Sequence, residues 1–190
     1  VTGVQTCALP ISAKTLHWLM SLMIFGLLLL GFYMSDLPLS PEKLKFYSWH
    51  KWAGVTIFLL AFIRLGWRIT HKPPEMPAEM PLLQQRAALL FHVALYVLMF
   101  IIPLSGWLMS SAKGYQTVWF GVLPIPDLLP KDKVVGDVLQ ELHEILNTVL
   151  IGILAIHILA ALKHHFFDKD DVLKQMLPSK QTTDHEETAV

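Results

Sequence analysis

Four long apolar segments, separated by polar or proline-rich stretches, dominate this chain of 190 residues. They cover residues 13–33, 45–69, 87–109 and 138–167. Each is long enough to cross a bilayer, which takes about 20 residues of α-helix. A backbone in hydrocarbon must satisfy its own hydrogen bonds, so we expect each segment to be helical. The chain is also 54% hydrophobic and only 16% charged, which is too apolar for an ordinary soluble domain. The sequence therefore predicts an all-α membrane protein that folds as a four-transmembrane-helix bundle.

The two ends of the chain are not expected to belong to this bundle. The opening VTGVQTCALPIS matches a translated sequencing adapter, so we expect residues 1–12 to be read-through rather than native sequence. The membrane domain then covers residues 13–178, and residues 179–190 form a polar tail that we expect to be disordered.

Lysines and arginines give the orientation. If both termini lie on one side, that side carries nine of the 15 Lys and Arg residues and the other side carries six. The positive-inside rule then predicts that both termini are cytoplasmic. The longest loop, residues 110–137, falls on the outer side, and its Trp119 and Phe120 suit the membrane interface.

Four of the histidines inside the apolar segments, namely His17, His50, His143 and His157, are the strongest candidates, because histidine is costly in hydrocarbon and is usually functional there. His143 and His157 are 14 residues apart on one expected helix. At about 100° and about 1.5 Å per residue, their rings leave the same face about 21 Å apart, one near each side of the membrane. Helix direction places His50 at the outer depth of His143 and His17 at the inner depth of His157. Each layer thus has two imidazoles from different helices, as bis-histidine axial ligation of haem iron requires.

Other polar side chains near the inner layer are candidates for supporting roles. Arg64 and Arg68 are four residues apart on one helix face, and guanidinium pairs well with the carboxylates of haem propionates. Snorkelling to lipid headgroups is the alternative for both. His92 is a third histidine at the inner depth, and Tyr96 above it would crowd a porphyrin. We therefore interpret His92 as a hydrogen-bonding partner of a quinone or a propionate rather than as a ligand.

A set of short motifs occurs in a characteristic order. It comprises LHW at 16–18, WHKWAG at 49–54, RLGWR at 64–68, FHVALY at 91–96, PLSGW at 103–107 and a long run at 142–178. This set resembles the bacterial cytochrome b561 family, which is related to the membrane cytochrome b subunits of nickel hydrogenases. The resemblance implies two non-covalent b-type haems, with His17, His50, His143 and His157 at the ligand positions. It also implies a bacterial inner membrane location and electron exchange with ubiquinone or another quinone.

Three functions stay open at this stage. The first is a di-haem cytochrome that transfers electrons across the membrane, with a homodimer or a redox partner at the outer face both open. The second is a haem-bearing anchor subunit for a separate dehydrogenase or hydrogenase. The third is a haem-free metal-binding or transport bundle. A net charge of zero gives no argument for nucleic acid, and the single cysteine, Cys7, excludes an internal disulfide and a cysteine-bound iron–sulfur cluster.

Overall fold

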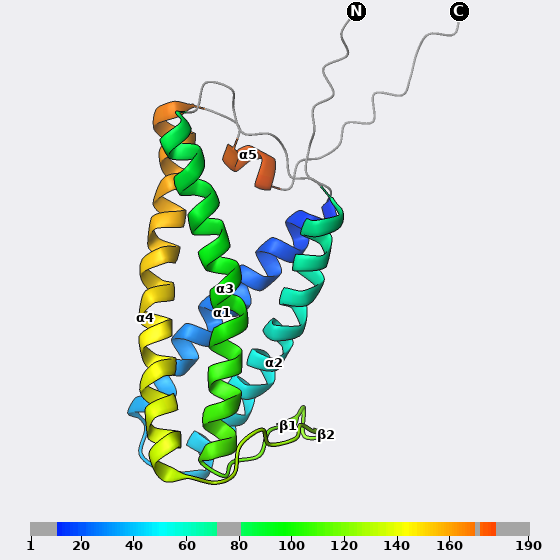
Figure 1. The fold of residues 1–190 in the computed structure, drawn as a ribbon, viewed down its shortest axis with the longest axis vertical. Coiled ribbons are helices and arrows are strands. Elements are labelled where there is room, and N and C mark those ends of the chain that lie inside the picture. Colours follow the sequence, from blue (N-terminus) through cyan, green and yellow to red (C-terminus); the bar gives the residue numbers. More distant parts are fainter. Residues whose placement is uncertain (1–10, 72–80, 170–171, 178–190) are drawn as a thin grey trace, which may run out of the picture.

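The computed structural model describes residues 11–71, 81–169 and 172–177, and within them the four predicted helices are present. They are α1 (Ile11–Asp36), α2 (Pro41–Thr70), α3 (Leu82–Ala112) and α4 (Lys133–Lys163), as Figure 1 shows. All four are long and apolar enough to cross a membrane. The predicted all-α four-helix membrane bundle is therefore confirmed. α1, α2 and α3 extend beyond their apolar segments at both ends, whereas α4 begins before its segment and ends inside it, at Lys163.

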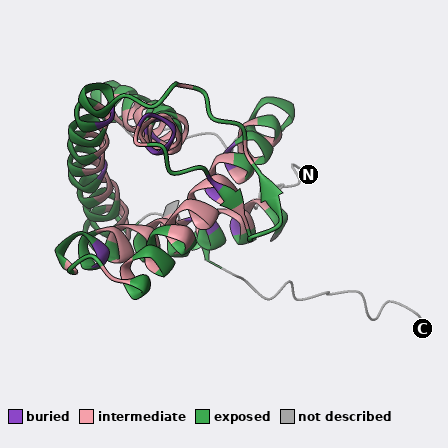
Figure 2. Cartoon of the chain, turned by 90° about the horizontal axis from the view of Figure 1, so that it is seen from below, coloured by how far each residue is buried: buried purple, intermediate pink, exposed green. Residues whose placement is uncertain are grey.

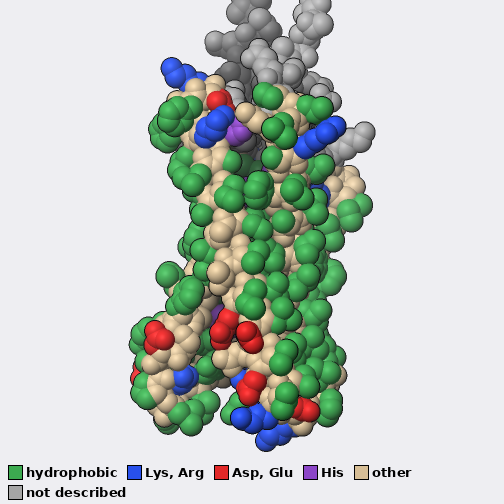
Figure 3. Space-filling view, turned by 60° about the vertical axis from the view of Figure 1, so that its left-hand side comes forward, with side chains coloured by type: hydrophobic (Ala, Val, Ile, Leu, Met, Phe, Trp, Pro, Cys, Tyr) green, Lys and Arg blue, Asp and Glu red, His purple; other side chains and the backbone are tan. Residues whose placement is uncertain are grey.

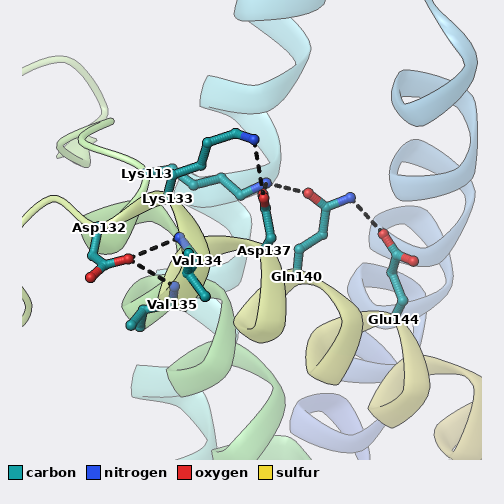
Figure 4. Close-up of polar contacts among 8 residues, drawn as sticks. All are labelled: Lys113, Asp132, Lys133, Val134, Val135, Asp137, Gln140 and Glu144. Atoms are coloured by element: carbon teal, nitrogen blue, oxygen red, sulfur yellow. Dashed lines mark hydrogen bonds and ion pairs between the residues drawn. The ribbon is translucent and has the colours of Figure 1, made fainter.

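Local sequence explains where α2 and α4 begin. The Ser40 hydroxyl accepts a hydrogen bond from the Lys43 amide at 3.1 Å, and Pro41 occupies the first turn. The Asp132 carboxylate accepts from the Val134 and Val135 amides at 2.8 and 3.1 Å (Figure 4). Both caps satisfy amides that a helix leaves unpaired at its N-terminus.

A polar network continues from this start along the first turns of α4 (Figure 4). Asp137 forms ion pairs with Lys113 at 3.4 Å and Lys133 at 3.8 Å. Lys113 also donates to Gln140, and Gln140 donates to Glu144 at 2.8 Å. The network joins the end of α3 to the start of α4, so it fixes the outer entrance of the helix that carries His143.

The helices pack in chain order, α1 on α2, α2 on α3 and α3 on α4. Met20, Ile57 and Ala61 form the buried centre of the α1–α2 contact, and Ala61 is fully inaccessible. Most other helical residues are at least partly exposed (Figure 2), and they include large apolar side chains such as Leu22, at 73%. Charged side chains gather mainly toward the two ends of the molecule, with a hydrophobic surface between them (Figure 3). This distribution suits contact with lipid along the middle of the bundle.

The loop between α3 and α4 contains a small hairpin that the sequence did not predict. β1 (Val118–Trp119) pairs antiparallel with β2 (Leu123–Pro124), and positive φ angles of 50° at Phe120 and 72° at Gly121 turn the chain. The Trp52 indole on α2 donates to the Val118 carbonyl at 2.6 Å, and the Trp119 indole donates back to the Trp52 carbonyl at 3.2 Å. These reciprocal bonds attach the hairpin to α2.

At the opposite end, α4 continues as a π-helical turn, His164–Asp168, followed by the short helix α5 (Val172–Met176). The Lys14 ammonium donates to the Leu177 carbonyl at 3.1 Å, and the Trp18 indole donates to the Met176 carbonyl at 2.8 Å. The start of α1 and the segment after α4 therefore lie at the same end of the bundle (Figure 1).

Some of the predicted boundaries lie outside the described residues. Of the segment 1–12, only Ile11 and Ser12 are described, and they form the first residues of α1. The tail 179–190 and most of the proline-rich connection between α2 and α3 lie outside the described residues. The division of the chain at residues 12 and 178 therefore stays a proposal.

Candidate haem sites

The outer pair of histidines meets across the interior between α2 and α4. The ring centroids of His50 and His143 are 6.4 Å apart, and the ring planes are inclined at 77°. A Cβ at Gly31 of α1 would lie 3.5 Å from Cε1 of His50, and a Cβ at Gly106 of α3 would lie 3.2 Å from Cε1 of His143. Each ring thus lies against a glycine of a neighbouring helix. The contact would be an ordinary one at Gly31, whereas a Cβ at Gly106 would require the His143 ring to shift by a few tenths of an ångström.

The inner pair has nearly the same geometry between α1 and α4. The centroids of His17 and His157 are also 6.4 Å apart, with an angle of 71° between the rings. His143 and His157 both lie on α4, about 21 Å apart along its axis. Each of them therefore lies close to one histidine of another helix, at its own depth in the bundle. The predicted assembly of four histidines into two layers agrees with this arrangement.

The spacing within each pair tests whether a metal fits between the rings. An imidazole nitrogen binds a metal at about 2.0 Å and lies about 1.15 Å from its ring centroid, so two rings that bind one metal from opposite sides have centroids about 6.3 Å apart. Both pairs match that distance. Among the described residues, no three His, Cys, Asp or Glu side chains group closely enough to hold a metal ion. Two ligands per site suit a metal that brings its own equatorial nitrogens, as haem iron does.

Arg64 contacts the inner pair directly. Its guanidinium donates to Nδ1 of His17 at 3.1 Å, from a half-buried position on α2. Arginine stays protonated in proteins, so Nδ1 is the acceptor and the ring proton lies on Nε2. Binding a metal through Nε2 would therefore require that this proton move to Nδ1 and that Arg64 release the ring.

His92 and Arg68 differ in their relation to the inner pair. The His92 ring lies 5.5 Å from the His157 ring, so the third inner histidine does reach this site. That distance is shorter than two axial ligands need, whereas the distance from His17 to His157 is suitable. Arg68 is exposed near the inner end of α2. The sequence thus placed both residues at the correct end of the molecule.

The residues four positions after the ligand candidates leave the rings free. The Ser21 hydroxyl donates to the His17 carbonyl at 2.8 Å, and the Asn147 amide donates to the His143 carbonyl at 2.7 Å. Around Gly54, four residues after His50, a Cβ would meet nothing within 4 Å. The Ser21 and Asn147 side chains therefore bond back to their own helices, and Gly54 leaves open space around its Cα.

Sequence reasoning missed three residues that touch the outer pair. Gly31 and Gly106 support the two rings, and the Ser105 hydroxyl lies 2.9 Å from Nδ1 of His143. The motif PLSGW at 103–107 does contain Ser105 and Gly106, but the sequence alone assigned neither residue a role at the site. Ser105 and Gly106 were therefore visible in the motif, but their contact with His143 on α4 could not be identified without the fold.

Comparison with known proteins gives consistent matches. The family model of prokaryotic cytochrome b561 matches residues 8–179. Cytochrome b561 homolog 2 of Escherichia coli strain K12 is 34% identical over 177 residues, which cover 89% of this chain and 90% of the relative. Cytochrome b561 homolog 1 of the same strain is 28% identical over an alignment of 132 residues, which covers 70% of this chain and 74% of the relative. A protein of Yersinia pestis named probable superoxide oxidase CybB is 27% identical with the same coverage.

The family match extends over nearly all of the described bundle, and four membrane-spanning helices with paired interior histidines agree with it. The chain therefore belongs to the prokaryotic cytochrome b561 family of membrane cytochromes, which bind haem b and transfer electrons.

Proposed function

We propose that this protein is a di-haem cytochrome that transfers electrons across the bacterial inner membrane, between an outer donor and the quinone pool. His50 and His143 would hold the outer haem, and His17 and His157 the inner one. The observation that supports this proposal is the equal 6.4 Å spacing of two ring pairs at two depths. Haem, when bound, supplies the one-electron couple, and the chain positions it and tunes its potential.

Bis-histidine ligation would favour electron transfer over binding of dioxygen, because both axial positions of the iron are filled. α4 supplies one ligand to each layer, so a single rigid helix would set the separation of the two cofactors. Along α1 and α2, the buried contact of Met20, Ile57 and Ala61 lies between the depths of the two histidine pairs.

The inner site has groups that suit a carboxylate or a quinone. If His17 held the inner haem through Nε2, its Nδ1 would carry the ring proton, and the Arg64 guanidinium would then be available to pair with a propionate. His92 lies next to His157 without matching the spacing of a ligand, so its second nitrogen is a candidate partner for a quinone oxygen. The π-helical turn adds His164 and Asp168, joined at 3.2 Å, at the same end of the molecule. π-Helical turns occur frequently at functional sites.

Proteoliposomes test transmembrane transfer. Vesicles that contain the haem-loaded protein are loaded with ferricyanide and given an impermeant reductant outside. We expect the wild-type protein to reduce the trapped ferricyanide, and His143→Ala and His157→Ala each to slow this at least about tenfold, since each removes one cofactor from the chain. A variant that lost one haem but kept the wild-type rate would contradict the proposal.

A second candidate, superoxide as the outer electron donor, is favoured by Lys51. Lys51 directly follows His50 in α2. Its ammonium donates to the Tyr115 and Gln116 carbonyls and to the Ser110 hydroxyl. Among the described residues, no ion pair includes Lys51, although the Asp127 carboxylate is near enough to interact with it electrostatically, so its positive charge is only partly offset. A cation beside the outer site would attract an anionic donor. Two superoxide ions would each give one electron, forming two dioxygen molecules, and a quinone would take up both electrons with two protons.

Stopped-flow measurements separate this donor from others. Superoxide should reduce the haem of the wild-type protein in a salt-sensitive reaction. Lys51→Gln should slow that reaction severalfold, and Lys51→Arg should preserve it because the charge remains. Equal rates in all three proteins would remove superoxide as the candidate donor.

A further inference from the structure

We propose that Ser105 is a positioning residue for the outer haem, fixing His143 in the Nδ1–H form and lowering the reduction potential of that haem. The inference rests on the proposed function, because it takes His143 to be an axial ligand. Ser105 lies on α3, whereas the ligand candidates lie on the other three helices.

Two adjacent residues of α3 contact the His143 ring and hold it in place. The Ser105 hydroxyl lies 2.9 Å from Nδ1 of His143, and Ser105 is only 3% exposed. The neighbouring Gly106 leaves just enough room for the ring, since a Cβ there would lie 3.2 Å from Cε1 and 3.5 Å from Nδ1. The ring is therefore fixed by a hydrogen bond and by close packing together.

A second hydrogen bond of Ser105 determines where the ring proton is. The hydroxyl donates to the Ile102 carbonyl at 2.8 Å, and a carbonyl oxygen can only accept. A serine hydroxyl has one hydrogen, so toward His143 the oxygen must accept. Nδ1 of His143 therefore carries the proton, which leaves the lone pair of a neutral ring on Nε2, the nitrogen needed by a metal.

The other candidate ligands that can be compared lack this arrangement. Nδ1 of His17 faces the Arg64 guanidinium, which is a donor. Nδ1 of His50 is buried and has no hydrogen-bond partner among the described residues. Ser105 thus gives Nδ1 of His143 a hydrogen-bond acceptor, which Nδ1 of His50 and Nδ1 of His17 lack among the described residues.

This acceptor has an electronic consequence. A hydrogen bond from the remote N–H of a ligating histidine makes the imidazole more basic, and mutation of such a partner changes metal affinity about 10- to 100-fold. A more basic ligand favours ferric over ferrous iron and lowers the reduction potential. Removing the hydroxyl should therefore raise the potential of the outer haem, and a tenfold change in preference corresponds to about 59 mV for one electron.

Redox titration of haem-loaded variants tests the proposal, with haem content measured on the same samples. His143→Ala identifies the outer component as the one that it removes. We expect Ser105→Ala to keep both haems, to raise the outer midpoint potential by an amount equivalent to about tenfold, and to leave the inner one unchanged. Ser111→Ala is the matched control, because Ser111 is a 2% exposed serine of the same helix whose hydroxyl, within the described part of the chain, bonds to backbone atoms of Trp107 and Leu128. It should leave both potentials unchanged.

The pair Ser105→Thr and Ser105→Val separates the hydroxyl from packing, since the two side chains have nearly the same shape. Threonine should retain the outer haem and its potential, whereas valine should raise that potential or lose the haem. If the two variants behave alike, or if Ser105→Ala leaves the outer potential unchanged, the proposed role of Ser105 is wrong. The assignment of the four histidine ligands would not be affected by that result. If His143→Ala retains both haems, the ligand assignment itself fails, and that result is distinct from a failure at Ser105.

Discussion

The four interior histidines share a spacing but differ in their surroundings. The His143 ring is fixed between Ser105 and Gly106, whereas His17 is held by the Arg64 guanidinium. The His143 ring therefore already presents Nε2 as an acceptor for a metal. The His17 ring would first have to lose its hydrogen bond from Arg64. We expect the outer haem to bind more readily to the newly folded chain for this reason.

Alanine substitution of single histidines tests the pairing. His143→Ala should remove the outer haem and His157→Ala the inner one, because each variant leaves one iron with a single axial ligand. His92→Ala should retain both haems, since the His92 ring is too near His157 to share an iron with it. The measurement is haem content together with the reduced α-band. Loss of a haem in His92→Ala, with retention in His17→Ala, would show that the inner pairing is wrong.

Gly106 provides a steric test at the same site. Gly106→Val should displace the His143 ring, which a Cβ would approach at 3.2 Å, and should deplete the outer haem by more than half. Gly152→Ala on α4 is the control, because a Cβ there meets nothing within 4 Å, and this variant should retain both haems. Absorption spectra of the purified proteins give the comparison. Full occupancy in Gly106→Val would contradict the close packing described here.

The pairing of histidines was predictable because spacing and helix direction fix depth and, on α4, the face as well. Their supporting residues were not. Gly31, Ser105 and Gly106 act on rings from other helices, and neither depth nor periodicity identifies which ring a residue faces. Contacts of this kind depend on the rotation of one helix against another, which a single sequence does not specify.

At the scale of elements, the helices followed from apolar length, but the structures between and after them did not. The β1–β2 hairpin has only two residue pairs, and Phe120 adopts a positive φ, which is unusual for an aromatic residue. Its bonds to Trp52 supply the stabilisation that its own strands are too short to give. The π-helical turn His164–Asp168 likewise forms with an ion pair between Lys163 and Asp168 and a 3.2 Å contact between Nδ1 of His164 and the same carboxylate, neither of which apolar periodicity reveals.

The contact between α1 and the segment after α4 should respond to Lys14. Lys14→Met keeps the buried stem but removes a charged donor to the Leu177 carbonyl, a bond of about 1.5–3 kcal/mol. If cleavage follows local opening, trypsin should then cut after Lys174 about tenfold faster. Lys43→Met is the control, because Lys43 makes similar bonds to the Ser35 and Leu37 carbonyls between α1 and α2. Equal cleavage rates in both variants would argue against this contact as the stabilising one.

At the scale of the whole molecule, the start of α1 and the segment after α4 share one end, and the hairpin lies at the other (Figure 1). The lysine and arginine distribution predicts that the first of these ends is cytoplasmic. The inner site would then face the cytoplasm, where protons for quinone reduction are taken up.

Reporter fusions test this orientation. A green fluorescent protein fused after the last residue should fluoresce, and alkaline phosphatase fused there should be inactive, because the enzyme requires export for its disulfides. Alkaline phosphatase inserted in the outer loop at residues 113–132 should be active. The reverse pattern would place the termini outside and would exchange the inner and outer sites.

The number of haems per chain tests the central claim most directly. Protein expressed with haem supplied, purified in detergent and assayed for haem b against quantitative amino-acid analysis should contain two haems per chain, one for each ring pair. A value of one, or a colourless folded protein, would contradict the assignment of both pairs as axial ligands.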